Sequence, residues 1–192
     1  MNTPAHLVLN ALVLGRGRWR PHWLAITVGA LLPDLPMFGF YFYERVVMAN
    51  PEQLIWSQLY FKPHWQNLFD FFHSLPIIAV GAIIAWRFRM EAWLVFFLSM
   101  AMHCLADLPL HNEDAHRHFF PLSAWQFHSP ISYWDPHRYG LLFVGLEVLL
   151  VVVGSIFLAL GYQSRPWRMI GIITLAVYLG FAVFAFSVWA MQ

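Results

Sequence analysis

Residues 102–119 read MHCLADLPLHNEDAHRHF, and they place four histidines and three carboxylates directly after the apolar run AWLVFFLSMAM. His103 and Asp107 are four positions apart, so they share one face of a helix. An imidazole and a carboxylate at this spacing can chelate one ion, although a buried hydrogen-bonded pair is their commoner use. Pro109 is expected to end the helix before His111 can extend that face.

A second candidate is Asp34, which the motif LLPDLP places between two prolines. Prolines break a helix, and a broken helix at membrane depth is tolerated where it is buried or lines a cavity. The carboxylate could therefore face a shared site. The alternative is that Asp34 only caps the amides that its own helix break leaves free.

Three further ionisable residues stand inside apolar sequence: His6 in TPAHLVLN, His73 in DFFHSLP and Glu147 in LLFVGLEVLL. Taken singly, either histidine is expected to be an ordinary interfacial residue. Glu147 is a lone carboxylate. It is expected either to pair helices or support a neighbouring ligand, or to act directly as a ligand or base.

The composition places these residues in a membrane. The 192 residues are 60% hydrophobic and 11% charged, and the mean hydropathy is +0.57, whereas soluble domains carry about 25% charged residues. The length suits one membrane-embedded domain, 1–192. The net charge of +1 argues against a nucleic-acid partner. The arginines follow the first apolar run, which is the wrong order for a cleaved signal peptide.

Five apolar runs approach the roughly 20 residues that a membrane-spanning helix needs. The sequence therefore predicts an all-α integral membrane bundle of about five transmembrane helices. A sixth run, 5–14, is too short to span and is expected to form a half-inserted helix. The five predicted spans are 22–43, 71–86, 92–110, 140–162 and 169–191.

The arginines between these spans predict the orientation. Five alternating spans put all three arginine clusters on one side, which the positive-inside rule makes cytoplasmic. We therefore expect a multi-pass protein of the plasma (inner) membrane, with the loops 44–70 and 111–138 outside. The clusters are Arg16, Arg18 and Arg20; Arg87 and Arg89; and Arg165 and Arg168.

A helix rises about 1.5 Å per residue, so the number of residues from an arginine cluster gives a depth in the membrane. Five ionisable residues lie at similar depths, roughly 15 to 27 Å from the level of the arginines. They are His6, Asp34, His73, His103 and Asp107. No Lys or Arg is expected at that depth, so the carboxylates need protons or cations. A mixed His/Asp shell suits zinc, manganese or iron, bound as one or two ions. His111 or Asp114, in an outer metal-site loop at about 111–139, could complete the shell.

Short motifs over residues 3–134 resemble those of the YdjM-like family of membrane-bound metal-dependent hydrolases: PAHL, GALLPD, FHSL, MHCLADLPL and HFFPLSAWQFHSPISYWD. The resemblance implies that the same five residues are metal ligands and that Ser74 is the serine following the family histidine. The family is distantly similar to zinc-dependent phospholipases C, which implies phosphoester chemistry.

The chain departs from the family pattern at two places. Pro36 stands where the family often has a second aspartate, and Asp70 and Phe71 stand where an arginine and a glycine are common. His111, Asp114 or Glu147 are the candidates to replace the missing ligand.

The loop after the histidine-rich stretch is crowded with aromatic residues, among them Trp125 and Phe127. Trp and Tyr favour the headgroup layer, so an anchoring belt is one interpretation. The other is a lid that contacts the acyl chains or headgroup of a lipid. Arg117 and Arg138 flank this segment and could bind a phosphate.

These features favour metal-dependent hydrolysis of a phosphoester in a lipid or lipid-linked substrate, with Asp107 or Glu147 accepting the proton. One alternative is a transporter or metal-ion carrier that uses the same ligands. It would need a polar path to the cytoplasm, for which the sequence offers little. Another is a haem protein with His73 and His103 as axial ligands, which leaves the aspartates without a role. The oligomeric state stays open.

Overall fold

The computed structural model describes residues 1–162 and 164–190, with side chains described as far as residue 180. Within these ranges the chain is all-helical and contains no strand, as predicted. The helices are α1 (Thr3–Leu14), α2 (Trp23–Leu31), α3 (Leu35–Phe42), α4 (Glu52–Leu54), α5 (Pro63–Phe72), α6 (Leu75–Arg87), α7 (Glu91–Asp107), α8 (Gly140–Gly161) and α9 (Arg165–Ala190).

Four segments are long and apolar enough to cross a bilayer, which fits a membrane protein. The first two are compound, because α2 and α3 share one span and α5 and α6 share another. The four segments are Gly17–Val47, Pro63–Arg87, Glu91–Leu110 and Gly140–Gly161. The fifth predicted run forms most of α9, but its side chains beyond residue 180 lie outside the described part.

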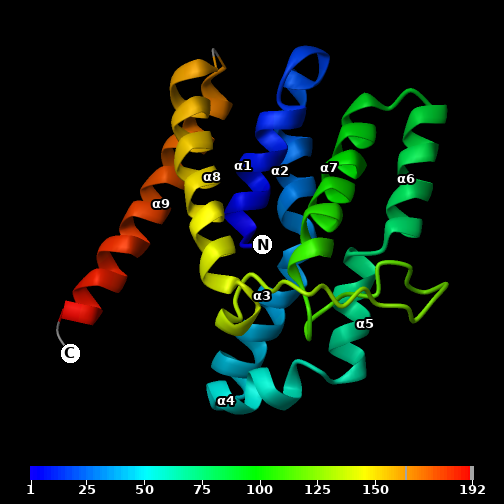
Figure 1. The fold of residues 1–192 in the computed structure, drawn as a ribbon. Coiled ribbons are helices and arrows are strands. Elements are labelled where there is room, and N and C mark those ends of the chain that lie inside the picture. The colour runs from blue at the N-terminus through cyan, green and yellow to red at the C-terminus, as the bar shows by residue number, and fades with distance from the viewer. Residues whose placement is uncertain (163, 191–192) are drawn as a thin grey trace.

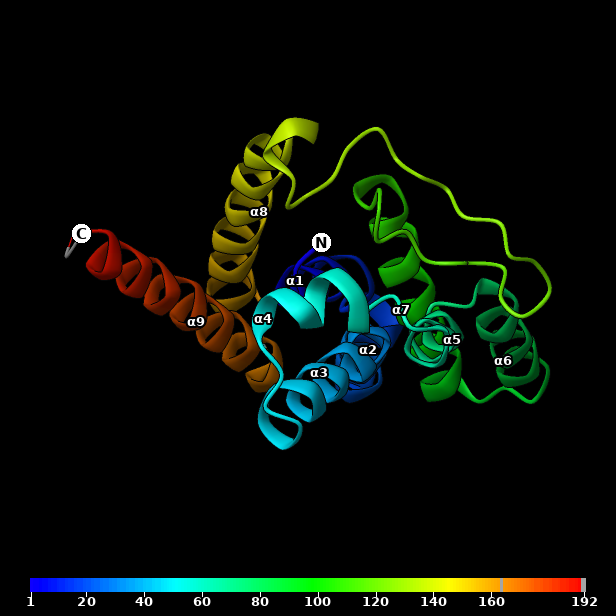
Figure 2. The ribbon, with the colours of Figure 1, turned by 90° about the horizontal axis from the view of Figure 1, so that it is seen from below.

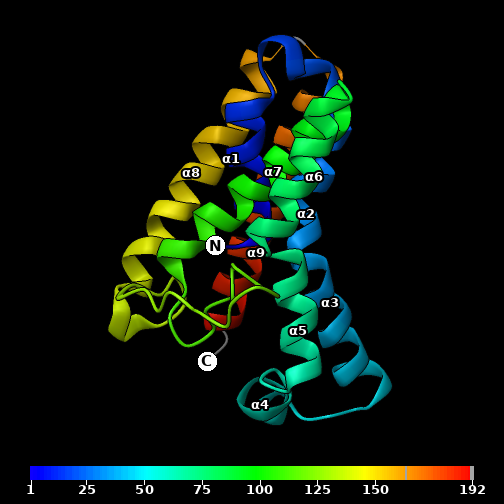
Figure 3. The same cartoon turned by 90° about the vertical axis from the view of Figure 1, so that its right-hand side faces the viewer.

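The three arginine-bearing turns lie at one end of the molecule (Figure 1). The helix α1 starts near mid-height beside the N-terminus and rises to this same end, so it covers only part of the bundle's height (Figures 1 and 3). The α7–α8 segment and the helices α3 to α5 lie at the other end. The alternating spans predict this arrangement, with the arginine clusters at one end of the bundle and the long loops at the other.

Both compound spans are interrupted near the level of the N-terminus in Figure 1. The α2–α3 span changes to a 3-10 turn over Leu32–Asp34, because Pro33 and Pro36 cannot donate the helical hydrogen bonds. In the α5–α6 span, helix α5 ends with His73 as its C-cap and Ser74 is the N-cap of α6. Ser74 Oγ caps α6 by accepting from the amide of Ile77 at 3.3 Å.

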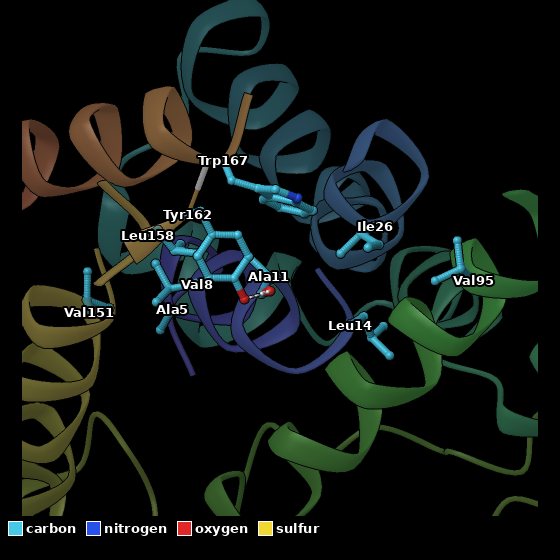
Figure 4. Packing of buried hydrophobic residues seen from close by; sticks show 10 residues of the cluster. All are labelled: Ala5, Val8, Ala11, Leu14, Ile26, Val95, Val151, Leu158, Tyr162 and Trp167. Carbon is cyan, nitrogen blue, oxygen red and sulfur yellow. Dashed lines mark hydrogen bonds between the residues drawn. The ribbon is translucent and has the colours of Figure 1, made fainter. Parts of the chain in front are cut away.

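The end with the arginines is held by apolar packing around α1 (Figure 4). Close approach of the helices depends on small residues, since a Cβ added to Gly154 of α8 would come within 2.4 Å of Val8 Cγ1 on α1. The Tyr162 hydroxyl donates to the Ala11 carbonyl at 3.3 Å. The buried cluster contains Ala5, Val8, Ala11, Leu14, Ile26, Val95, Val151, Leu158, Tyr162 and Trp167.

One buried polar link crosses this apolar region. Asn10 Nδ2 donates to both the carbonyl and the Oγ of Ser99 at 2.8 Å, and Ser99 Oγ donates to the Ile26 carbonyl at 2.7 Å. The link joins α1, α7 and α2. His6 lies on α1 and His103 on α7, and Asp34 lies in the turn that follows α2. The link therefore fixes the positions of these helices relative to one another.

The segment between α7 and α8 is irregular and runs past α5 and α6 before it returns to α8 (Figure 2). Its path is fixed by hydrogen bonds to the second helix break. The Leu75 amide donates to the His118 carbonyl at 2.8 Å, and the Ser74 hydroxyl donates to the Phe120 carbonyl. This brings the histidines of the segment close to His73.

Candidate metal centre

Four buried side chains from three helical segments converge on one point: Asp34, His73, His103 and Asp107. One ligand atom from each lies within 4.8 Å of the others. The sequence predicted that these four residues share a depth, and the structure confirms that they meet. They could hold a metal ion.

The two histidines of this group present the ring nitrogen that a metal would need. Nδ1 of His73 lies 2.9 Å from the Phe69 carbonyl, and Nδ1 of His103 lies 2.8 Å from the Ala30 carbonyl. A carbonyl only accepts, so each Nδ1 carries a proton, and in the neutral ring the Nε2 lone pair is left for a metal. Both Nε2 atoms are buried, and among the described residues neither makes a hydrogen bond of good geometry, although Nε2 of His103 lies 3.0 Å from Asp107 Oδ2. Metal-binding histidines are oriented in this way.

The carboxylates complete the group at suitable distances. Nε2 of His103 lies 3.0 Å from Asp107 Oδ2 and 3.4 Å from Asp34 Oδ1, and Nε2 of His73 lies 3.9 Å from Asp107 Oδ2. Ligands at about 2.0–2.1 Å from a tetrahedral ion are roughly 3.3 Å apart. These three separations lie near that value, so the donor set could hold a divalent ion.

Each of these residues is placed by the end or interruption of a helix. His103 and Asp107 occupy one face of the last turns of α7, as their spacing predicts. Asp34 closes the 3-10 turn between α2 and α3, and His73 is the C-cap of α5. The Thr3 hydroxyl donates to Asp34 Oδ2 at 2.6 Å, which orients this carboxylate.

His6 lies beside the group of four rather than in it. Its ring stacks on that of His103 with centroids 3.6 Å apart, and its Nε2 lies 3.0 Å from Asp107 Oδ1. The Met1 amino group lies 2.6 Å from the same oxygen. Asp107 thus has a basic neighbour that the sequence did not predict.

His111 and Asp114 form a hydrogen-bonded pair on the outer side of Asp107. Nδ1 of His111 lies 2.8 Å from Asp114 Oδ2, and its Nε2 lies 3.4 Å from Asp107 Oδ1. Burial lowers the pKa of His111, but the two carboxylates outweigh it and raise this pKa to about 9. Burial raises the pKa of Asp114, but the hydrogen bond from His111 outweighs it and lowers this pKa.

The sequence did not predict two features of the site: that His116 belongs to it, and that Asp70 is the partner of His116. The His116 ring stacks on His73 with centroids 3.9 Å apart, and its Nδ1 lies 3.5 Å from Asp70 Oδ1. Asp70 is three positions before His73, so helical spacing could have predicted that it shares this face. Arg117 pairs with Asp70, its Nε 2.5 Å from Oδ2, so this predicted phosphate-binding side chain is occupied within the protein.

Two predicted catalytic residues have other contacts. Glu147 accepts from the Asn2 side chain at 2.5 Å and from the Tyr178 hydroxyl at 3.0 Å, so it joins α8 to α9 and to the start of α1. Ser74 caps α6 and donates to the Phe120 carbonyl. Neither belongs to the group of four residues that could hold a metal ion.

A pocket of about 260 Å³ opens from this centre, with Asp34, His111 and His116 in its wall. Its other lining residues are Met1, Asn2, Thr3, Met37, Phe38, Tyr41, Trp56 and Tyr133. The predicted lid residues Trp125 and Phe127 are 50% and 39% exposed and do not line it. Arg138 is also outside its lining, with its Nε 3.6 Å from Asp135 Oδ2. The aromatic wall instead comes largely from residues 37–56.

Comparisons with protein-family models, with curated proteins and with solved structures found no match to this chain.

Proposed function

We propose that this chain is a membrane-embedded, metal-dependent hydrolase that cleaves a phosphoester in a lipid or lipid-linked substrate, as its resemblance to the YdjM-like family implies. The observation that carries the proposal is the convergence of the buried Nε2 atoms of His73 and His103 on the carboxylates of Asp34 and Asp107. Of these four residues, Asp34 also lines the pocket of about 260 Å³. Among the described residues no Lys or Arg contacts this donor set, although the Met1 amino group lies 2.6 Å from Asp107 Oδ1. Ionisable side chains buried in a membrane mark functional sites.

The bound ion, with zinc favoured and manganese or iron as alternatives, would polarise a phosphoryl oxygen and lower the pKa of a water molecule. Asp34, His73, His103 and Asp107 would hold it. We assign proton transfer to His111, whose Nδ1 lies 2.8 Å from Asp114 Oδ2. Its imidazole also lines the pocket. Asp114 fixes the tautomer of His111, so that Nε2 is the atom that exchanges protons.

A lipid substrate is favoured by the walls of the pocket. Met37 and Phe38 line it on the α3 side, and the Phe38 side chain is 57% exposed on the surface of a membrane-spanning segment. We propose that the pocket opens on this side toward the apolar part of the bilayer. An acyl or isoprenoid tail can remain in the membrane while its phosphate reaches the ligands.

The two alternatives find less support. A carrier needs a polar path across the membrane, but Asn10 donates to Ser99 and Ser99 donates to the Ile26 carbonyl, beside a packed apolar cluster. Axial haem ligation needs a flat open slot between two histidines. Here the His103 ring stacks at 3.6 Å on His6 and its Nε2 contacts Asp107.

The proposed activity can be tested on purified protein with a phosphatidic acid or lysophosphatidyl ester as substrate. We expect hydrolysis that chelators abolish and that zinc or manganese restores. Replacing His111 by glutamine should lower kcat by about 100-fold, as removal of a general acid or base does, with a smaller effect on KM. Full activity after chelation would contradict metal dependence, and an unchanged kcat in the variant would contradict the role of His111.

We also propose that the arginine-bearing end is cytoplasmic and the metal centre faces the outer side. Phe88, which is 67% exposed at the α6–α7 turn, is a suitable site for a single cysteine in a Cys104→Ser background. We expect the Phe88→Cys protein to react with an impermeant maleimide only after the cells are opened. Labelling of intact cells would show the opposite orientation, with the arginine-bearing end outside.

A further inference from the structure

A second pocket of about 510 Å³ adjoins the first, and the two share Met37, Trp56 and Tyr133 in their linings. Its walls combine aromatic rings with carboxylates. The residues that matter here are Trp56, Tyr60, Tyr133, Trp134, Glu113 and Asp114. None of the four residues of the metal centre lines this pocket, and it shares only Asp114 with the proton-transfer pair His111 and Asp114.

The indole rings in this pocket are held in place by hydrogen bonds at their edges. Trp56 Nε1 donates to Glu52 Oε2 at 3.0 Å, and Trp134 Nε1 donates to Asp114 Oδ2 at 3.2 Å. Their rotation is restrained, so the pocket walls are preorganised. Aromatic faces attract cations through the ring quadrupole.

The carboxylates add negative charge to the same walls. Glu113 and Asp114 both line the pocket, and none of its described lining residues is a lysine or arginine. Oδ1 of Asp114 is buried and has no hydrogen-bond partner among the described atoms. A buried carboxylate oxygen without a partner is costly, so this wall is suited to a ligand that carries positive charge or N–H donors.

We infer that the second pocket binds an ammonium group, such as that of choline or ethanolamine, in the headgroup of the substrate. This inference rests on the proposed function, because it places the phosphate of the same molecule in the first pocket, beside Asp34, His111 and His116. The shared lining of the two pockets lets one headgroup reach both.

The chemistry distinguishes this ligand from others. An acyl chain would fill an apolar pocket and would leave Glu113 and Asp114 without a role. A phosphate would be repelled by both carboxylates. A bare divalent cation prefers several oxygen ligands, whereas aromatic walls suit a large, weakly hydrated organic cation.

The test is calorimetric binding of phosphocholine to the purified protein in a maltoside detergent, which has no ammonium group. The uncharged isostere 3,3-dimethylbutyl phosphate is the matched ligand. We expect phosphocholine to bind at least about 10-fold more tightly than the isostere, the range of a desolvated cation–π contact. Trp56→Leu and Glu113→Gln should each remove most of this difference. Trp86→Leu is the control, because Trp86 is 68% exposed near the arginine-bearing end of α6 and does not line the second pocket.

Two further measurements separate the possible failures. Competition by nanodiscs of phosphatidylcholine, but not of phosphatidylglycerol, would identify a lipid headgroup, whereas competition by free choline alone would identify a soluble ammonium ligand. Both outcomes support the ammonium site. Equal binding of phosphocholine and its isostere would overturn this inference even if metal-dependent hydrolysis were observed. Selective binding without any hydrolysis would instead leave the ammonium site standing and contradict the proposed function.

Discussion

Replacing Asp107 by asparagine should remove nearly all of the divalent metal that the purified wild-type protein retains. Asp107 Oδ2 lies within 3.9 Å of Nε2 of both His73 and His103, so the change removes the charge that the two histidines share. Loss of an outer-shell partner alone lowers metal affinity by about 10–100-fold, and loss of a ligand should exceed that. Metal content per chain, measured by plasma mass spectrometry after gel filtration, checks the prediction.

A matched control lies on the same helix. Glu91 begins α7 with its side chain 56% exposed, at the opposite end from Asp107. Glu91→Gln removes one carboxylate charge from α7 without touching the centre, so its metal content should equal that of the wild type. His103→Gln should behave like Asp107→Asn. Equal stoichiometry in all four proteins, each shown to be helical by circular dichroism, would contradict the metal centre.

The convergence of Asp34, His73, His103 and Asp107 was predictable because each belongs to a regular element or its interruption. Helical rise converts a count of residues from the arginine clusters into depth, and depth alone places these four residues, together with His6, in one slab of the membrane. Helical spacing then places His103 and Asp107 on one face. These arguments need no knowledge of which helices are neighbours, because side chains of this cost in a membrane face the protein interior.

The outer part of the site was not predictable in this way. The segment that carries His116 is irregular, so no period relates this residue to His73, on which its ring stacks. The place of Trp56 in the pocket wall depends on how the chain turns back after α3, and no motif in the sequence predicts that turn. A lid over the site was one interpretation of the aromatic loop, but position along the chain does not show which rings line a pocket. Tyr133 lines the first pocket, and Trp125 does not.

The packing of the helices was also beyond sequence reasoning. Gly29 and Gly39 are both single glycines in one broken span, and nothing in the local sequence distinguishes them. In the structure, a Cβ on Gly29 would lie 2.4 Å from the Phe96 carbonyl oxygen and 2.8 Å from Ser99 Cβ. A Cβ on Gly39 would meet nothing within 4 Å. Only the approach of α7 to α2 creates this difference.

Gly29→Ala should therefore destabilise the protein and weaken metal binding together. The neighbouring atoms belong largely to the α7 backbone, so α2 and α7 must move apart, and overpacking of this kind costs about 1–3 kcal/mol. The movement would separate Asp34, which follows α2, from His103 on α7, whose nearest ligand atoms are 3.4 Å apart. Thermal unfolding in detergent and metal content, measured on the same preparation, check both effects.

Gly39→Ala is the control for backbone effects, because it makes the same chemical change within the same compound span. It should be neutral or stabilising, since alanine is favoured over glycine in a helix by about 1 kcal/mol. Its metal content should match the wild type. If both variants unfold at the same temperature and retain the same metal, then α2 and α7 do not pack closely enough to hold Asp34 against His103. A fall in stability without loss of metal would show instead that the helix contact and the ligand geometry are independent.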